Sequence, residues 1–318
     1  MKLKFSLRAA IVALLALTVA ACGNAGGGDQ GGGGGGGEGD GPSVTVGSKN
    51  FTEQFVLGEL YAQALEAKGF NVERQLNLGS EQIADRALQD GQIDFYPEYT
   101  GTALVALLDY SEQKLENLNT PEATYEEARK LYSERNPADT MLTPADFNNN
   151  YGIFVRREIA EERNLKTMED LAEASPELRF ASYSEFQDRS DGYPNMQENY
   201  NFDFGDITIA NDLGLRYQGV TQGDADVGVG FLTDGQLASD DLVVMEDEKG
   251  IWPFYYPAPV VRSDVLEENP EMEEILNSVS ETLNVDVMRD LNGRVDLQQE
   301  EPADVAREHL EAEGLLEQ

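Results

Sequence analysis

The stretch GQIDFYPEYTGT, residues 91–102, indicates how this chain folds. A helical pattern over residues 81–89 ends at Gly91, and Ile93-Asp94-Phe95-Tyr96 follows as a strand. The unit is therefore a helix, a turn and a strand, and Tyr99 stands eight residues after Gly91. Units of this kind are typical of α/β proteins.

A second stretch, GDADVGVGF at residues 223–231, has the same organisation. A helical pattern over residues 212–222 precedes it, Val227-Gly228-Val229 reads as a strand, and Phe231 follows Gly223 by eight residues. A match this short also arises by chance. If it reflects the structure, two similar α/β lobes each carry an aromatic residue at a strand end, where ligands bind in open α/β sheets.

The rest of the chain favours the same class. Further strands are expected at residues 44–46, 72–77, 153–155 and 180–182, and a helix at 53–68. Strand–helix alternation of this kind predicts parallel sheets. From residue 268 the pattern is helical to the C-terminus, and we expect this run to pack on the first lobe.

The N-terminus predicts export and attachment to a membrane. An apolar run at residues 9–20 follows a positively charged start and is too short for an ordinary transmembrane helix, as in a signal peptide over residues 1–21. Cys22 directly after it resembles the bacterial lipobox, whose cysteine is lipidated. The alternative is an ordinary signal with a chance cysteine, but the chain has no other cysteine. The glycine-rich residues 22–42 predict a flexible tether.

Composition limits the possible partners. The 60 acidic and 23 basic residues give a net charge of -37. This charge rules against nucleic acid and anionic membrane surfaces as partners. It favours a soluble monomer in a salty or osmotically stressed setting. One histidine, His309, and one cysteine leave no basis for a His-based metal site, a disulfide or a Ser-His-Asp triad. We therefore expect no metal, no cofactor and no catalytic residue.

Six motifs from Val44 to about Arg262 carry a resemblance to a known family. They are GSKNFTEQ (47–54), QIDFYPEYTGT (92–102), DRSDG (188–192), LRY (215–217), FLTDG (231–235) and YYPAPVVR (255–262). In these the chain resembles the substrate-binding proteins of ABC importers for glycine betaine, choline, carnitine and related osmolytes. The resemblance implies a two-lobed α/β fold, the type II periplasmic-binding-protein fold, with a ligand cleft between lobes. Lobe one would comprise residues 44–148 plus 255–318, and lobe two residues 149–254.

The resemblance also implies an aromatic cage, formed by Tyr99, Tyr151, Phe231 and Tyr255. A trimethylammonium group has a charge but no N–H donor, so aromatic faces select it by cation–π attraction, worth about 0.5–2 kcal/mol per contact. The alternative for each ring is ordinary core packing. The family usually has Tyr at position 231, so Phe231 keeps the π face and loses a hydroxyl. Tyr256 replaces Tyr255 if Tyr255 points away.

The resemblance places Lys49, Thr102 and Arg189 around the carboxylate of a betaine. We call these three residues the carboxylate clamp. Lys49 precedes the first expected helix, whose N-terminus favours an anion, and Arg189 can donate two parallel hydrogen bonds. The alternative for either cation is a surface ion pair. Choline has no carboxylate, so the clamp favours betaine-type zwitterions. Glu98 and Asp234 are interpreted as supports for the turns and the hinge.

The sequence therefore predicts an extracytoplasmic receptor, anchored through a lipid on Cys22, that captures a glycine betaine-like osmolyte and delivers it to an ABC permease and its ATPase. Hinge closure around the ligand is the expected mechanism. One alternative is a receptor of the same fold for another small solute, such as an amino acid or ectoine. An extracytoplasmic enzyme and a solute sensor are less favoured alternatives.

Overall fold

The computed structural model describes residues 41–115 and 117–316. The expected signal peptide (1–21), Cys22 and the expected tether up to residue 40 lie outside the described residues. Within the described part of the chain, no helix is both long enough and apolar enough to cross a membrane.

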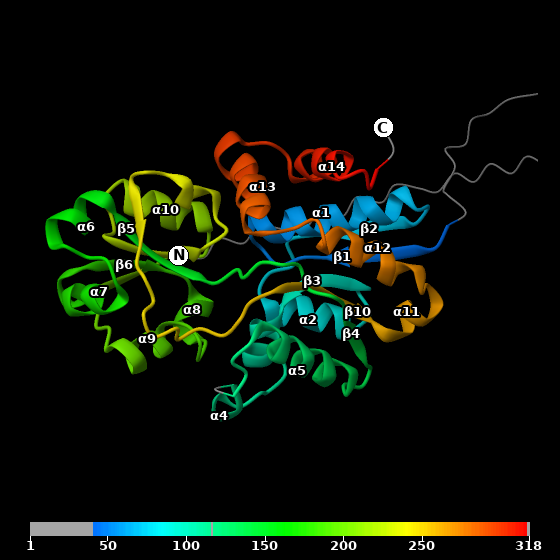
Figure 1. Ribbon diagram of the computed structural model, residues 1–318, viewed down its shortest axis with the longest axis horizontal. Coiled ribbons are helices and arrows are strands. Elements are labelled where there is room, and N and C mark those ends of the chain that lie inside the picture. The colour runs from blue at the N-terminus through cyan, green and yellow to red at the C-terminus, as the bar shows by residue number, and fades with distance from the viewer. Residues whose placement is uncertain (1–40, 116, 317–318) are drawn as a thin grey trace, which may run out of the picture. The chain divides into compact units, whose positions relative to one another are not determined.

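The first of two mixed α/β halves is built on a five-stranded sheet with the strand order β2-β1-β3-β10-β4 (Figure 1). Its strands are β1 (Ser43–Gly47), β2 (Asn71–Gln75), β3 (Phe95–Tyr99), β4 (Asp139–Met141) and β10 (Pro257–Arg262). Its helices are α1 (Thr52–Ala67), α2 (Glu81–Gln89), α3 (Thr100–Thr102), a π turn at Ala103–Leu107, α4 (Glu112–Leu115), α5 (Pro121–Ser133), α11 (Ser263–Glu268), α12 (Glu271–Ser280), α13 (Val285–Gln298) and α14 (Pro302–Ala312).

The second half is built on a five-stranded sheet with the order β7-β6-β8-β5-β9. Its strands are β5 (Tyr151–Arg156), β6 (Arg179–Ser182), β7 (Asp206–Ile209), β8 (Val227–Phe231) and β9 (Leu242–Val244). Its helices are α6 (Arg157–Arg163), α7 (Met168–Ala174), α8 (Ser184–Asp188), α9 (Tyr193–Tyr200) and α10 (Leu213–Thr221), with short 3₁₀ turns at Ser175–Glu177 and Gly235–Ala238.

The two sheets share one topology, with β2, β1, β3, β10 and β4 corresponding in order to β7, β6, β8, β5 and β9. The expectation of parallel sheets holds for only part of each sheet. In each half the first three strands of this order are parallel, but β10 runs antiparallel to β3 and β4, and β5 antiparallel to β8 and β9. The reason is that β5 and β10 each enter their sheet from the other half of the chain.

The short repeat noticed in the sequence corresponds to equivalent structure. Asp94 accepts a hydrogen bond from the backbone N–H of Thr45 on β1 (2.8 Å), and Asp226 accepts one from Arg179 on β6 (3.0 Å). The preceding glycines, Gly91 and Gly223, both have positive φ, 68° and 83°. The two aspartates therefore attach β3 and β8 to their neighbouring strands in the same way, and the strands end in equivalent positions.

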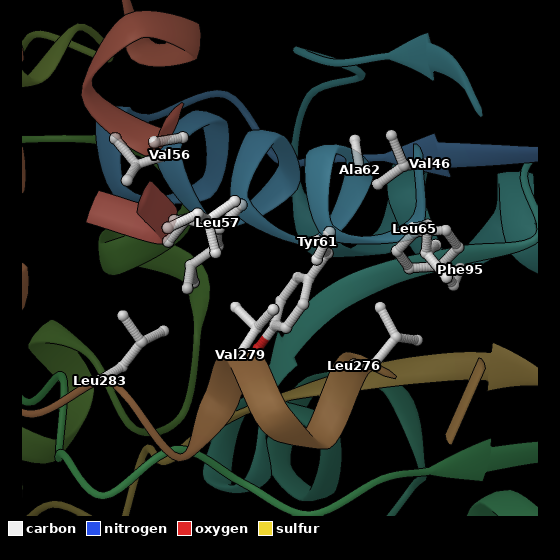
Figure 2. Close-up of a cluster of buried hydrophobic side chains, with 14 of the residues drawn as sticks. Val46, Val56, Leu57, Tyr61, Ala62, Leu65, Phe95, Leu276, Val279 and Leu283 are labelled. Atoms are coloured by element: carbon white, nitrogen blue, oxygen red, sulfur yellow. The ribbon is translucent and has the colours of Figure 1, made fainter. Parts of the chain in front are cut away.

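Helix α1 lies at the centre of the first half. It packs against α12, α13 and α14, and its side chains are buried almost all round, as expected of a helix enclosed between a sheet and other helices (Figure 1). Figure 2 shows Tyr61 of α1 directed towards Val279 on α12, with Leu57 in the same cluster of buried side chains. The Tyr61 hydroxyl lies 3.0 Å from Ser280 Oγ, so its polar atom is paired inside the core.

Two connections join the halves, one between β4 and β5 and the other between β9 and β10. They are hydrogen-bonded to each other. The Asn149 N–H donates to the Tyr255 carbonyl (3.0 Å), and the Tyr255 N–H donates to Asn148 Oδ1 (2.8 Å). The paired crossovers therefore place Tyr255 beside the start of β5.

Replacing Leu57, which has no exposed surface, by alanine should lower the free energy of unfolding by about 2–5 kcal/mol, because the emptied site loses apolar contacts. The matched control is Leu297→Ala in α13, where the side chain is 58% exposed and the change should stay within about 0.5 kcal/mol. Urea unfolding followed by circular dichroism measures both. Equal effects in the two variants would contradict a core role for α1.

Candidate functional site

A pocket between the two sheets is lined by residues from both halves of the chain. It contains about 690 Å³ of space not filled by atoms, part of it open to solvent. All seven residues that the sequence proposed are among its lining: Lys49, Tyr99, Thr102, Tyr151, Arg189, Phe231 and Tyr255. The structure thus brings together residues that are up to 206 positions apart in the chain.

Strand ends position three of the four rings of the aromatic cage, and Tyr255 stands in the crossover that precedes β10. Tyr99 is the last residue of β3 and Phe231 the last of β8, the two equivalent strands. Tyr151 begins β5 and is the direct cross-strand partner of Phe231. Their rings lie 5.8 Å apart at an interplanar angle of 27°, while the Tyr255 ring stands edge-on to Tyr151 at 5.6 Å.

Tyr255, and not Tyr256, faces the pocket. Tyr255 is buried in the lining and its hydroxyl donates to Asp191 Oδ2 (2.6 Å), whereas Tyr256 is half-buried and outside the lining. Gly101 makes room for this ring, because a Cβ atom at that position would lie 2.9 Å from the Tyr255 ring.

Phe51 is a fifth aromatic side chain of the pocket that the sequence reasoning missed. Its ring stacks between two cage rings, 6.3 Å from Tyr99 and 5.4 Å from Phe231. The signal was present, because Phe51 belongs to the motif at residues 47–54 and directly precedes α1.

The Lys49 ammonium is already paired in this structure. It forms a buried ion pair with Glu98, whose carboxylate is fully buried. Burial raises the pKa of Glu98, and Lys49 opposes this shift without cancelling it. Glu98 also accepts a hydrogen bond from the Tyr99 N–H (2.6 Å), which agrees with a supporting role at this turn. The same ammonium lies 4.5 Å from the centroid of the Tyr99 ring. Lys49 therefore places a cation against the cage from within the protein.

Arg189 is also paired with acids. Its guanidinium donates two hydrogen bonds to Asp191 (2.8 and 2.6 Å) and one to Glu81 at the start of α2 (3.0 Å). Thr102 Oγ1 is 3.5 Å from the same guanidinium. Arg189 belongs to the half that holds the second sheet, and Glu81 and Thr102 to the other half. These contacts therefore connect the two sides of the pocket.

Arg216 is a third cation in the lining, and the sequence reasoning gave it no role although it lies in the LRY motif. It stands on the buried face of α10 with Leu213, Tyr217 and Val220. This helical spacing was visible in the sequence, and an arginine at a core-facing position is an unusual feature that could have drawn attention to it. Its guanidinium lies 4.3 Å from the centroid of the Tyr183 ring, another unassigned member of the lining.

The buried carboxylate of Glu53 is hydrogen-bonded to several side chains at and beside the pocket. Glu53 accepts hydrogen bonds from the Tyr99 hydroxyl (2.7 Å) and the Asn149 amide (2.8 Å) on one oxygen, and from the Asn292 amide (3.0 Å) on the other. Burial raises the pKa of Glu53, and these hydrogen bonds oppose that shift. Thr233 joins the network by donating to Asn149 Oδ1 (3.0 Å).

Asp234 fixes the turn that follows the Phe231 ring. A single carboxylate oxygen accepts the Phe231 N–H (2.7 Å) and the Tyr217 hydroxyl (2.8 Å). Burial is the main influence and raises the pKa of Asp234 to about 7, against the lowering effect of these hydrogen bonds. This position agrees with the interpretation of Asp234 as a support for a turn.

Across residues 41–115 and 117–316, no group of three or more histidine, cysteine or acidic side chains is arranged to hold a metal ion. His309 is half-buried on α14 beside Thr282 and does not line the pocket. The pocket chemistry in the described residues is therefore that of aromatic faces, ion-paired charges and amide groups.

Comparison with known proteins gives consistent matches over the described chain. The family described as "Substrate binding domain of ABC-type glycine betaine transport system" matches residues 42–312. The glycine betaine-binding protein YehZ of Escherichia coli is 32% identical over 280 residues, covering 85% of this chain and 90% of the relative. A glycine-betaine-binding protein of Pseudomonas aeruginosa is 33% identical over 285 residues, covering 86% and 89%.

A solved structure of a glycine betaine/carnitine/choline ABC transporter protein superposes with a TM-score of 0.70 at 26% identity, covering 87% of this chain and all of the other. The predicted fold class, a two-lobed α/β fold of the type II periplasmic-binding-protein kind, is therefore confirmed.

Replacing Asp234 by asparagine should remove one pH-dependent contribution to stability. Because the pKa is raised from 3.8 to about 7, the folded state holds this proton more tightly than the unfolded state, and the contribution is lost as pH rises through that window. Asparagine can still accept both hydrogen bonds through its carbonyl oxygen. The free energy of unfolding of the wild type, relative to Asp234→Asn, should therefore fall between pH 4 and 7 and level off above it.

The measurement is urea unfolding at a series of pH values. Asp290→Asn, at an exposed position of α13, serves as the matched control and should run parallel to the wild type. Parallel curves for Asp234→Asn as well would mean that Asp234 does not titrate in this range.

Proposed function

Because the chain belongs to the family of substrate-binding domains of ABC-type glycine betaine transport systems, we propose that it captures glycine betaine or a closely related quaternary ammonium zwitterion in the pocket between its lobes. The observation that carries the proposal is the cage itself. Tyr99, Tyr151, Phe231 and Tyr255 come from both halves of the chain and surround one space.

The cage suits a cation that cannot donate hydrogen bonds. A trimethylammonium group gains from the faces of several rings at once, and it gives up less hydration than a primary ammonium does. The Lys49 ammonium beside the Tyr99 ring supports this assignment, because it shows that the surroundings of Tyr99 accept a positive charge. Glu98, paired with Lys49, keeps the net charge near this ring from becoming strongly positive.

The carboxylate end of the ligand is proposed to meet Lys49, Thr102 and Arg189. Lys49 and Arg189 hold acidic partners in this structure, so a ligand carboxylate has to share these cations with Glu98, Asp191 and Glu81. Arginine has five N–H donors, and sharing is therefore possible for Arg189. A small anionic end group fits this role better than a hydroxyl, which carries no charge to compete for the cations.

Closure of the two lobes around the ligand is the proposed mechanism. The pocket takes its lining from both halves, which only two crossovers join, so a bound ligand contacts both sides and favours the closed arrangement. The contact of Arg189 with Glu81 across the pocket supports this geometry.

Substrate-binding proteins of ABC importers act outside the cytoplasmic membrane, and members of this family bind solutes. We propose that Cys22 carries the lipid anchor, that residues 22–42 form the tether, and that the receptor works as a monomer without catalysis. Its partners would be the permease and its ATPase. The net charge of -37 supports a soluble, monomeric receptor domain.

The Phe231→Leu variant tests the cage without disturbing a hydroxyl. Leucine keeps the apolar bulk and removes the π face, so glycine betaine affinity should fall by about 2- to 30-fold. In 3,3-dimethylbutanoate an uncharged carbon replaces the quaternary nitrogen of glycine betaine and the carboxylate is kept. The affinity for this analogue should change much less. Isothermal titration of the wild type and the variant with both ligands measures the difference.

Phe55→Leu is the matched control, since Phe55 is half-buried in α1 and does not line the pocket. It should bind both ligands as the wild type does. If the folded wild type bound neither glycine betaine nor choline, the receptor would serve another class of solute. Equal losses for both ligands in Phe231→Leu would remove cation–π attraction as the basis of selection.

A further inference from the structure

The pocket holds three cationic side chains, and they differ in how their charge is balanced. Lys49 pairs with Glu98, and Arg189 pairs with both Asp191 and Glu81. Arg216 is 3% exposed and, among the described residues, forms no ion pair with any acidic side chain. The third cation is therefore buried without a counter-charge of its own.

The contacts of Arg216 leave most of its donors free. One terminal nitrogen donates to the Val229 carbonyl (2.8 Å), and the guanidinium lies over the Tyr183 ring at 4.3 Å. Its Nε is buried and has no hydrogen-bond partner among the described residues. Asp234, the acid whose charge acts on it, uses one oxygen to accept bonds from Phe231 and Tyr217 and forms no ion pair with Arg216.

Such an arrangement is costly unless an anion completes it. Burying a charged group without a partner disfavours the folded state by several kcal/mol in general, and an unpaired buried donor adds to this. The chain has 60 acidic residues, so a counter-charge was readily available, yet at Arg216 none is placed. A single bond to a backbone carbonyl does not require a guanidinium, because a neutral amide would serve.

We propose that Arg216 binds the carboxylate of the captured zwitterion directly, and that it is the residue that most strongly distinguishes carboxylate-bearing ligands from those that lack an anionic end. The inference rests on the proposed function and adds to it. Lys49 and Arg189 already have carboxylate partners, whereas Arg216 gains its first one when the ligand enters.

The position of Arg216 agrees with this role. It lines the same pocket as the cage, and the Tyr183 ring beneath it lies 6.5 Å from the Phe231 ring of the cage. One aromatic ring therefore separates the guanidinium from the cage. Arg216 lines the pocket from the buried face of α10, so a ligand whose ammonium group rests on the cage occupies the same pocket as this guanidinium.

The test compares glycine betaine with glycine betaine amide, which keeps the trimethylammonium group and the carbonyl but has no negative charge. Isothermal titration of the wild type and of Arg216→Gln with both ligands gives four affinities. Loss of a charged hydrogen bond should lower glycine betaine affinity by about 10- to 150-fold, while amide affinity should change by less than about threefold. The ratio of glycine betaine affinity to amide affinity should therefore be smaller in Arg216→Gln than in the wild type.

Arg216→Lys keeps the charge and should retain more betaine affinity than Arg216→Gln, and it replaces the glutamine variant if that variant fails to fold. Arg163→Gln, outside the pocket and paired with Glu177, is the matched control and should bind like the wild type.

Equal losses for both ligands in either folded variant, or no loss for either ligand in folded Arg216→Gln, would overturn the inference while the proposed function stands. A folded wild type that binds no quaternary ammonium compound would overturn both.

Discussion

The buried carboxylate of Glu53 is the constraint on which the pocket depends. It stands in the first turn of α1, where the helix dipole favours a negative charge, and the side chains that donate to it are neutral. These donors come from the end of β3, from the first crossover and from α13. One carboxylate thus fixes a cage ring, a hinge segment and the C-terminal helices together. Movement of the crossover has to preserve or exchange these bonds, so the hinge and the cage are mechanically connected.

Acidic residues pair with two of the three cations of the pocket. Glu98 holds Lys49, and Asp191 with Glu81 holds Arg189. Burying an unpaired cation disfavours the folded state. Pairing it with a carboxylate reduces this unfavourable free energy and still leaves N–H donors available. The pairing also holds Tyr99 and Tyr255, because Glu98 accepts the Tyr99 N–H and Asp191 accepts the Tyr255 hydroxyl. The charges and the rings of the site are therefore positioned by the same carboxylates.

Much of this arrangement was readable in the sequence, and what was not readable has a physical reason. The repeated unit ending in Tyr99 and Phe231 predicted two lobes with aromatic strand ends, because strand–helix periodicity and turn glycines are local signals. The antiparallel entry of β5 and β10 was missed, since strand direction depends on which half the chain has just left. Arg216 and Tyr183 were missed because an ion pair, or its absence, is a property of packing and not of spacing. The helical spacing of Arg216 with Leu213, Tyr217 and Val220 places an arginine on the buried face of a helix, which is unusual. Only the structure shows that this face of the helix borders the pocket.

Phe231 has no hydroxyl, and its ring is held in a different way from the tyrosine rings of the pocket. The hydroxyls of Tyr99 and Tyr255 have buried acceptors, Glu53 and Asp191, that help to orient their rings. The Phe231 ring is oriented differently, through its backbone, because Asp234 accepts the Phe231 N–H and the β5 pairing sets the strand beneath it. A hydroxyl at this position would add polarity to the cage without being needed to hold the ring. At position 231 the strand and the turn determine where the ring stands.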